Sequence, residues 1–380
     1  MHRGGGSYIG TGVEQAIGSY PPKMRQRIYL DHAATTPILR QARDAASRAM
    51  DLWANPNSPH TEGRQARALL EEARDTIKRT LDWPHDVIFT PGASEAIELA
   101  ARQAGVVGRA HGATEHSIVP YAMGQCSVVI PVDPNGLIDE AALEQVLNSR
   151  PALVAIQQVN NETGVIQPLD RLAPKIREAG SLLLADCAQG ASKMPLPDAD
   201  LIAICAHKLG GPPGIGALLV RDLGTLKPAG AGQEKGYRRG TQNVPGALAF
   251  AAALEARPYD MARLSALRQR LEQGAKDIGG VIIAEGTPRL PTIGAIALTG
   301  ATSAGLLVRL DLAGIAVSAG SACSSGKMEP SHVLQAMGVP PEIAGSYIRI
   351  SFGPQTSQAE VDVVIAQFRQ IAERLTSKAA

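Results

Sequence analysis

The stretch "LIAICAHKLGG", residues 201–211, passes from a short apolar run into a lysine and two glycines. A continuous apolar run of this length is typical of a strand that is buried on both faces of a parallel sheet. Lys208 stands just beyond the end of that strand. Its side chain is either a surface charge that extends to solvent where the strand emerges, or a catalytic amine at the edge of the sheet. These residues alone leave both interpretations open.

Apolar runs and helical patterns alternate through the first two thirds of the chain. Strand-like runs occupy residues 87–90, 152–159, 181–186, 201–206 and 216–221. Helical patterns lie between them at 95–104, 139–148 and 168–180. This alternation predicts an α/β fold with a mostly parallel central sheet that helices cover on both faces. In such sheets a ligand site lies at the carboxyl ends of the strands.

The pattern changes beyond residue 257, where a helical stretch at 261–278 precedes short strands and a final helix at 359–375. We therefore expect a large domain over residues 24–257. A smaller α+β C-terminal domain follows over 258–380, and part of the N-terminal segment joins it. Residues 1–23 are glycine-rich and lack the apolar core of a signal peptide, which predicts a flexible extension.

Composition excludes several classes of partner. The formal net charge is +1, which gives no electrostatic reason for direct nucleic-acid or anionic membrane binding. No apolar run reaches the roughly 18 residues that a membrane helix needs. The four cysteines, Cys126, Cys187, Cys205 and Cys323, form no CxxC pair and no zinc-like cluster with histidine, so no metal site is predicted. Sparse cysteines suit a reducing cytoplasm.

Polar residues follow several of the predicted strands. After residues 87–90 come Pro91, Gly92, Ala93 and Ser94, and we expect Ser94 to be the N-cap of the next helix. A helix start of this kind is an anion site, although an ordinary cap has the same sequence.

Two further strand ends are equally ambiguous by themselves. Asn160 and Asn161 follow one strand and are frequent turn formers. Asp186 closes another, with Gln189 three residues on, and is either a helix cap or the partner of a buried cation.

One cofactor requires this set of groups together. Pyridoxal 5'-phosphate needs a lysine that bonds to its aldehyde, an acid opposite its pyridine nitrogen and a phosphate cup at a helix start. Lys208, Asp186 and residues 92–94 meet these needs. A nucleotide site is not supported, because the chain has no GxxxxGK[ST] pattern. "GGPPGIG" (210–216) precedes a strand and does not open a helix.

Ten motifs resemble, in order, those of cysteine desulfurases, which are class V, fold-type I pyridoxal phosphate enzymes. They span about residues 28 to 375 and read "YLDHAATTP", "NPNSPHTEGRQAR", "FTPGASEA", "TEHSIV", "VNNETGVIQP", "LADCAQG", "AHKLGGPPGIGAL", "YRRGTQNVP", "SAGSACSSGKMEPSHVL" and "YIRISFG". The context of the ninth motif is similar to the NifS/IscS-type branch, in which the reactive cysteine lies on a long mobile loop.

The resemblance implies roles for individual residues of the cofactor site. Lys208 matches the lysine that bonds to the cofactor, and Asp186 the partner of the pyridine nitrogen. Gln189 matches the hydrogen-bond partner of the ring hydroxyl. His116 matches the histidine that stacks on the ring and takes part in acid–base chemistry. The resemblance also implies a set of residues around the phosphate and the ring: Gly92, Ala93, Ser94, Asn161, Cys205, His207 and, from the other subunit, Thr241.

The resemblance implies the substrate contacts as well. Asn161 and Arg349 match the clamp for the substrate carboxylate, a task that the planar guanidinium fork suits. Cys323 matches the cysteine that accepts the sulfur. Two positions depart from the family: Cys205 stands where Ser or Thr is usual, and Glu98 where Asn is usual.

The expected function is that of a cysteine desulfurase. The enzyme converts L-cysteine to L-alanine and keeps the sulfur as a persulfide on Cys323 for iron–sulfur cluster assembly or other sulfur transfer. The resemblance also implies a cytoplasmic homodimer and a sulfur-accepting protein such as an iron–sulfur scaffold. Two alternatives are another class V enzyme, such as an aminotransferase or selenocysteine lyase, and a homologue that acts only as a scaffold or regulator.

Overall fold

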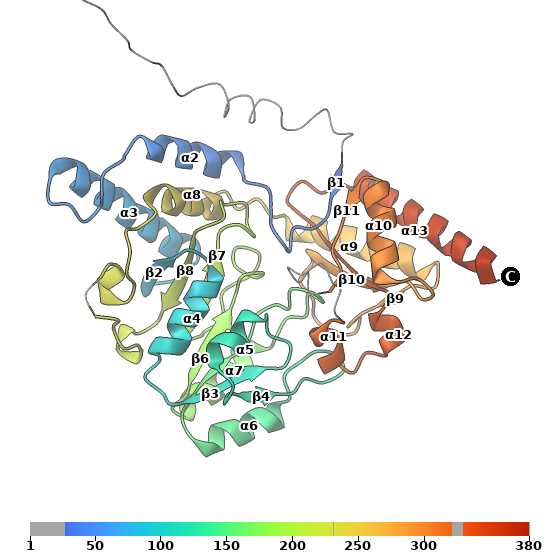
Figure 1. Cartoon of the computed structure of the whole chain (residues 1–380), viewed down its shortest axis with the longest axis horizontal. Coiled ribbons are helices and arrows are strands. Elements are labelled where there is room, and N and C mark those ends of the chain that lie inside the picture. Colours follow the sequence, from blue (N-terminus) through green and yellow to red (C-terminus); the bar gives the residue numbers. More distant parts are fainter. Residues whose placement is uncertain (1–26, 231, 321–329, 380) are drawn as a thin grey trace, which may run out of the picture.

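A seven-stranded sheet forms the centre of the larger part of the molecule (Figure 1). The computed structural model describes residues 27–230, 232–320 and 330–379. The strand order is β2-β8-β7-β6-β5-β3-β4. The strands are β2 (Asp86–Thr90), β3 (Gly108–Gly112), β4 (Val128–Ile130), β5 (Ala152–Ala155), β6 (Leu182–Asp186), β7 (Leu201–Cys205) and β8 (Gly216–Val220).

The sheet is mostly parallel, as the sequence predicts. Strands β7, β6, β5, β3 and β4 pair in parallel, whereas β8 runs antiparallel to both of its neighbours, β7 and β2. Strand β2 consequently runs in the same direction as the parallel strands. The carboxyl ends of β2, β3, β5, β6 and β7 therefore all meet at one edge of the sheet.

Helices cover both faces, because each central strand is apolar on both sides. Val154, Leu183 and Ile202 join one buried cluster with residues of α2, α3, α6, α7 and α8. Their sequence neighbours Leu153 and Leu184 join a second cluster with residues of α4 and α5. These helices are α2 (Arg40–Met50), α3 (Thr61–Thr80), α4 (Ala93–Gln103), α5 (Ile118–Met123), α6 (Glu140–Ser149), α7 (Leu169–Glu178) and α8 (Val244–Glu255).

The C-terminal part contains a separate antiparallel sheet of order β12-β10-β9, with α9 and α13 beside it (Figure 1). Its elements are α9 (Met261–Lys276), β9 (Val281–Ile282), β10 (Ile293–Ala297), α10 (Ser303–Leu312), β11 (Ile315–Ala316), α11 (His332–Ala336), α12 (Pro341–Ala344), β12 (Tyr347–Ser351) and α13 (Gln358–Ala379). The N-terminal strand β1 (Ile28–Tyr29) pairs in parallel with β11. Leu30 also lies in the apolar cluster of this part. The domain boundary at residues 257–258 stays a prediction, and residues 1–23 lie outside the described residues.

Candidate functional site

A cavity of about 940 Å³ opens at the sheet edge where the strands end. Its wall combines the segments that follow β2, β6 and β7 with residues that precede α5 and residues of the C-terminal part. The predicted site residues on this wall are Gly92, Ala93, Ser94, His116, Asn161, Asp186, Cys205, His207, Lys208 and Arg349. Residues that are more than 250 positions apart in the sequence thus share one cavity.

Lys208 lies in the turn after β7, with its backbone held from two sides. Its carbonyl oxygen accepts hydrogen bonds from Thr36 Oγ1 (3.2 Å) and Tyr259 Oη (3.3 Å). The backbone N–H of Thr36 also donates to the carbonyl of His207 (2.8 Å). Within the described residues, no hydrogen bond or ion pair engages the Lys208 amine. The half-buried side chain therefore reaches the cavity with its amine free, which favours the catalytic interpretation over a surface charge.

Asp186, the last residue of β6, and Gln189, three residues beyond it, hold unused acceptors. Asp186 accepts the backbone N–H of Ala188 with one carboxylate oxygen (2.9 Å). Gln189 is 3% exposed and lies behind the cavity wall, where its Nε2 donates to the Ala33 carbonyl (2.9 Å). Its Oε1 is buried with no partner among the described residues. A buried acceptor without a partner costs free energy, so this oxygen fits a ligand hydroxyl that donates to it.

The start of α4 presents free backbone groups to the cavity. The N-cap is Gly92, with extended backbone, and no side chain caps this end in the described part of the chain. The expectation that Ser94 is the N-cap is wrong, because the helix begins at Ala93 and Ser94 is an exposed residue of its first turn. Glycine is itself a favoured N-cap residue, and Gly92 packs closely on Gly216, where a Cβ would lie 2.8 Å from the Gly92 Cα. The uncapped N–H groups and the helix dipole suit a phosphate.

Two histidines on the wall are less basic than usual. Burial and then the nearby Lys208 charge lower the pKa of His116, and the same two causes lower that of His207 to about 4. His116 Nδ1 accepts the Ile118 N–H (3.4 Å), and the ring remains exposed to the cavity. Both imidazoles are therefore neutral at pH 7. A neutral ring can stack on a planar ligand and can accept a proton.

Arg349 and Asn161 meet at the far side of the cavity. Arg349 is 6% exposed, and its guanidinium donates to the Asn161 carbonyl (3.1 Å) and to the Asp31 carboxylate (2.7 Å). Its Nε has no partner among the described residues. Asp31 orients the guanidinium before any ligand arrives. The sequence analysis did not select Asp31, although it lies within the first motif quoted.

Sequence reasoning also missed a group of polar residues that connects the C-terminal part to the wall of the cavity. Glu162 accepts a hydrogen bond from Ser331 Oγ (2.6 Å), and its backbone carbonyl accepts one from Tyr347 Oη (3.0 Å). His332 lines the cavity with its Nε2 2.9 Å from the Glu115 carbonyl oxygen. The signal for His332 was its place in the "EPSHVL" stretch beside the predicted reactive cysteine.

The remaining predicted residues have different surroundings. Cys205 is buried on the wall, where burial raises the pKa of its thiol, so the group is neutral. Glu98 also lines the cavity, one helical turn beyond Ser94. Thr241 is exposed and does not line the cavity of its own chain. Cys323 lies outside the described residues, but Gly320 and Pro330, on either side of the segment that carries it, both line the cavity.

Two searches of the structure gave negative findings. Among residues 27–230, 232–320 and 330–379, no group of three or more His, Cys, Asp or Glu side chains is placed to hold a metal ion. In the same residues no helix has both the length and the apolar character needed to span a bilayer.

Known proteins share this arrangement along nearly the whole chain. The aminotransferase class-V family matches residues 28–364. A cysteine desulfurase of Cereibacter sphaeroides is 34% identical, over 92% of this chain and 97% of that protein. The X-ray structure of a NifS-like protein from Rickettsia africae superposes with a TM-score of 0.84 at 29% identity, covering 92% of this chain and 100% of that one. A structure described as SspA in complex with cysteine superposes with a TM-score of 0.72 at 28% identity, covering 87% and 100%.

Proposed function

The chain belongs to the class-V aminotransferase family, among the cysteine desulfurases of NifS/IscS type, and we propose that it converts L-cysteine to L-alanine and retains the sulfur as a persulfide on Cys323. The observation that carries this proposal is the single cavity that holds a free lysine amine, a carboxylate, an uncapped helix start and a preoriented arginine. The solved relative in complex with cysteine supports the choice of substrate.

The cavity residues fit pyridoxal 5'-phosphate. We propose that Lys208 bonds to it and that Asp186 faces its ring nitrogen. The unpartnered Oε1 of Gln189 would accept a hydrogen bond from its ring hydroxyl, and the neutral His116 would lie on its ring. The start of α4, Cys205 and His207 surround its phosphate. When bound, the cofactor withdraws the electron pair that is released at the substrate α-carbon.

The protein's own residues then bind and orient the substrate. The guanidinium of Arg349, fixed by Asp31, pairs with the substrate carboxylate beside Asn161. The Lys208 amine, which has no competing partner among the described residues, moves the α-proton. His116 is neutral at pH 7 and can accept or return a second proton.

The sulfur step requires Cys323 to reach the substrate. Gly320 lines the cavity and lies three residues before Cys323, and three extended residues span about 10 Å. The connectivity of the chain therefore allows the thiol to reach the cavity. Its thiolate forms a bond to the substrate sulfur, the carbon–sulfur bond breaks, and the carbon skeleton takes up protons and leaves as alanine.

An assay of the purified holoprotein tests this function. Addition of L-cysteine with a thiol reductant should change the visible absorbance of the cofactor and release alanine and sulfide in equal amounts. An aminotransferase would instead release a keto acid, and a scaffold would release neither product. Either of those outcomes would overturn the proposal.

The site is expected to need a second copy of the chain. Thr241 is exposed and does not line the cavity of its own chain, so we propose that it contacts the phosphate in the partner subunit. Mixing Lys208→Ala chains with Thr241→Ala chains should restore part of the activity, because one of the two sites in each heterodimer then holds both residues. Absence of recovery, with heterodimers demonstrated by differential tagging, would place Thr241 outside the partner's site.

Cys205→Ser should bind the cofactor at least as tightly as the parent protein. The buried thiol is a weak donor, whereas a serine hydroxyl donates a charge-assisted bond to a phosphate, worth on the order of 1–3 kcal/mol before the cost of burying the hydroxyl. Equilibrium titration of the apoprotein with the cofactor measures this, and Cys126→Ser, on an exposed cysteine, is the control. A clear loss of affinity confined to Cys205→Ser would mean that this side chain does not face the phosphate.

The persulfide on Cys323 needs an acceptor. We propose a sulfur-accepting protein such as an iron–sulfur scaffold as the partner, and the cytoplasm as the location, because a reactive thiol and sparse cysteines suit a reducing compartment.

A further inference from the structure

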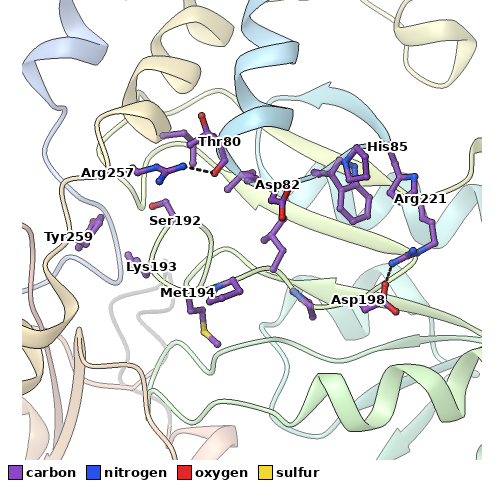
Figure 2. Close-up of a pocket in the computed structure, with 17 residues that line it drawn as sticks. Thr80, Asp82, His85, Ser192, Lys193, Met194, Asp198, Arg221, Arg257 and Tyr259 are labelled. Atoms are coloured by element: carbon purple, nitrogen blue, oxygen red, sulfur yellow. Dashed lines mark hydrogen bonds and ion pairs between the residues drawn. The ribbon is translucent and has the colours of Figure 1, made fainter.

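A second cavity, of about 710 Å³, lies away from the first and shares no lining residue with it. Its wall consists of the segment between α3 and β2, residues 192–198 after β6, and the segment that follows α8 (Figure 2). Cavities of this volume are the usual size for small-molecule sites. The proposed desulfurase reaction uses none of its residues.

Lys193 is the distinctive group of this cavity. Its side chain is only 7% exposed, yet no acidic residue or hydrogen-bond acceptor engages its amine within the described residues. Within the described residues, the Lys193 Nζ lies over the face of the Tyr259 ring, 5.0 Å from the ring centroid. Burial and then the charge of Lys208 lower the pKa of Lys193 to about 7. A buried amine without a counter-ion is costly, so an anion in the cavity would stabilise its charged form.

Other polar groups are available beside this amine. The Ser192 Oγ is buried and has no hydrogen-bond partner in the described part of the chain. In Figure 2, Ser192, Lys193, Tyr259 and Arg257 lie on one side of the cavity. Among the described residues, the exposed Arg257 makes only a long hydrogen bond, to the Thr80 carbonyl (3.5 Å). Three donors of the kinds that bind oxyanions are therefore largely unused.

The backbone around these donors is constrained. Asp82, Ser192 and Arg257 all adopt positive φ values, of 52°, 62° and 41°. Residues other than glycine rarely adopt this conformation, and such strain is found most often at functional sites. All three side chains line this one cavity.

The charges on the wall favour a monoanion. Asp198 is already paired with Arg177 and Arg221, on the opposite side in Figure 2. Among the described residues this leaves Lys193 and Arg257 as cations and Asp82 as the one carboxylate without a partner. With Lys193 protonated, as a bound anion favours, the surplus is a single positive charge, which matches one carboxylate better than a phosphate dianion.

The apolar residues on the wall include Trp83, Met194 and Leu196. We propose that this cavity binds a small organic monocarboxylate, with its carboxylate against Lys193, Ser192 and Arg257 and its apolar part against Met194, which lies beside them in Figure 2. This proposal is independent of the proposed desulfurase reaction.

Occupancy of this cavity is connected to the first site through Tyr259. The ring of Tyr259 contacts the Lys193 amine, while its hydroxyl donates to the carbonyl oxygen of Lys208 (3.3 Å). A carboxylate bound at Lys193 therefore lies one side chain away from the backbone of the proposed catalytic lysine.

Calorimetric titration of the holoprotein in a cationic buffer tests the proposal, with sodium benzoate as probe. Benzoate should bind saturably, and benzamide, its neutral analogue, about tenfold more weakly or worse, because it lacks the charge. Lys193→Met should weaken benzoate binding by about tenfold or more. Lys175→Met, which removes an exposed lysine of α7, is the matched control and should bind as the parent does.

Further variants and ligands distinguish binding in this cavity from binding in the first cavity, and a monocarboxylate from other classes of ligand. Arg349→Ala should retain benzoate binding, since Arg349 belongs to the first cavity. Arg257→Gln should also weaken binding, which gives a second test should Lys193→Met fail to fold. The proposal would be overturned if benzoate did not bind saturably or if benzamide bound equally well. It would also be overturned if only Arg349→Ala lost benzoate binding, or if phenyl phosphate bound more tightly than benzoate.

Discussion

Lys208→Ala is expected to abolish turnover of L-cysteine and the visible absorbance of the lysine-bound cofactor. Among the described residues the Lys208 amine enters the cavity without a partner, and no other lysine of those residues lines that cavity. Proton transfer by a positioned side chain contributes about 10²–10⁴-fold to a rate, and loss of the covalent anchor adds to this. We therefore expect turnover to fall by more than about 10³-fold.

Absorbance spectra and an alanine assay on the same preparation measure both effects. The control is Lys175→Ala, because this exposed lysine pairs only with Glu140 and Glu144 on the surface. It should retain the absorbance and the activity of the parent. A Lys208→Ala protein that still turned over cysteine at a comparable rate would show that the catalytic amine is another group.

Cys323→Ser is expected to separate cofactor chemistry from sulfur transfer. The first cavity keeps Lys208, Asp186, His116 and Arg349, so the cofactor absorbance and its response to L-cysteine should persist. A serine hydroxyl is far too weak an acid to supply an anionic nucleophile at neutral pH. Persulfide, sulfide and alanine should therefore all be lost or nearly so.

A cysteine outside both cavities provides the comparison for this variant. Cys126 is a free, exposed cysteine, and Cys126→Ser should keep the activity of the parent. Should Cys323→Ser form alanine at the parent's rate, the sulfur acceptor would have to be a different group, and the proposed role of Cys323 would be wrong.

The strands with continuous apolar sequence could be predicted because burial on both faces leaves a strong signal. Residues 182–186 and 201–205 are examples. Strand β3 could not be predicted, since its sequence "GRAHG" has glycine at both ends and a charged residue inside. It is a strand because β4 and β5 pair with it, while the Arg109 guanidinium donates to three backbone carbonyls.

The site shows the same division between local and long-range signals. Asp186 and Lys208 could be selected because Asp186 ends one apolar strand and Lys208 lies just beyond another. Asp31 could not be selected from the sequence, because its role depends on its contact with Arg349, which is 318 residues away. The error at Ser94 has a local cause: serine and glycine are both favoured N-cap residues, and the helix begins at Ala93 with Gly92 as its N-cap.

The second cavity gave no signal in the sequence. Lys193 lies in "GASKMPLP", a sequence in which a lysine is expected to be an ordinary surface residue. Only the packing of the segments around Tyr259 and Arg257 shows that its amine is enclosed and without a counter-ion.

The most direct test of the central claim is to locate the sulfur after a single turnover. The holoprotein receives one equivalent of L-cysteine without reductant, its thiols and persulfides are alkylated, and the peptides are identified by mass spectrometry while alanine is quantified. The account predicts one alanine for each persulfide, with the extra sulfur on Cys323. A persulfide on Cys126, Cys187 or Cys205, or alanine formed without any persulfide, would contradict it.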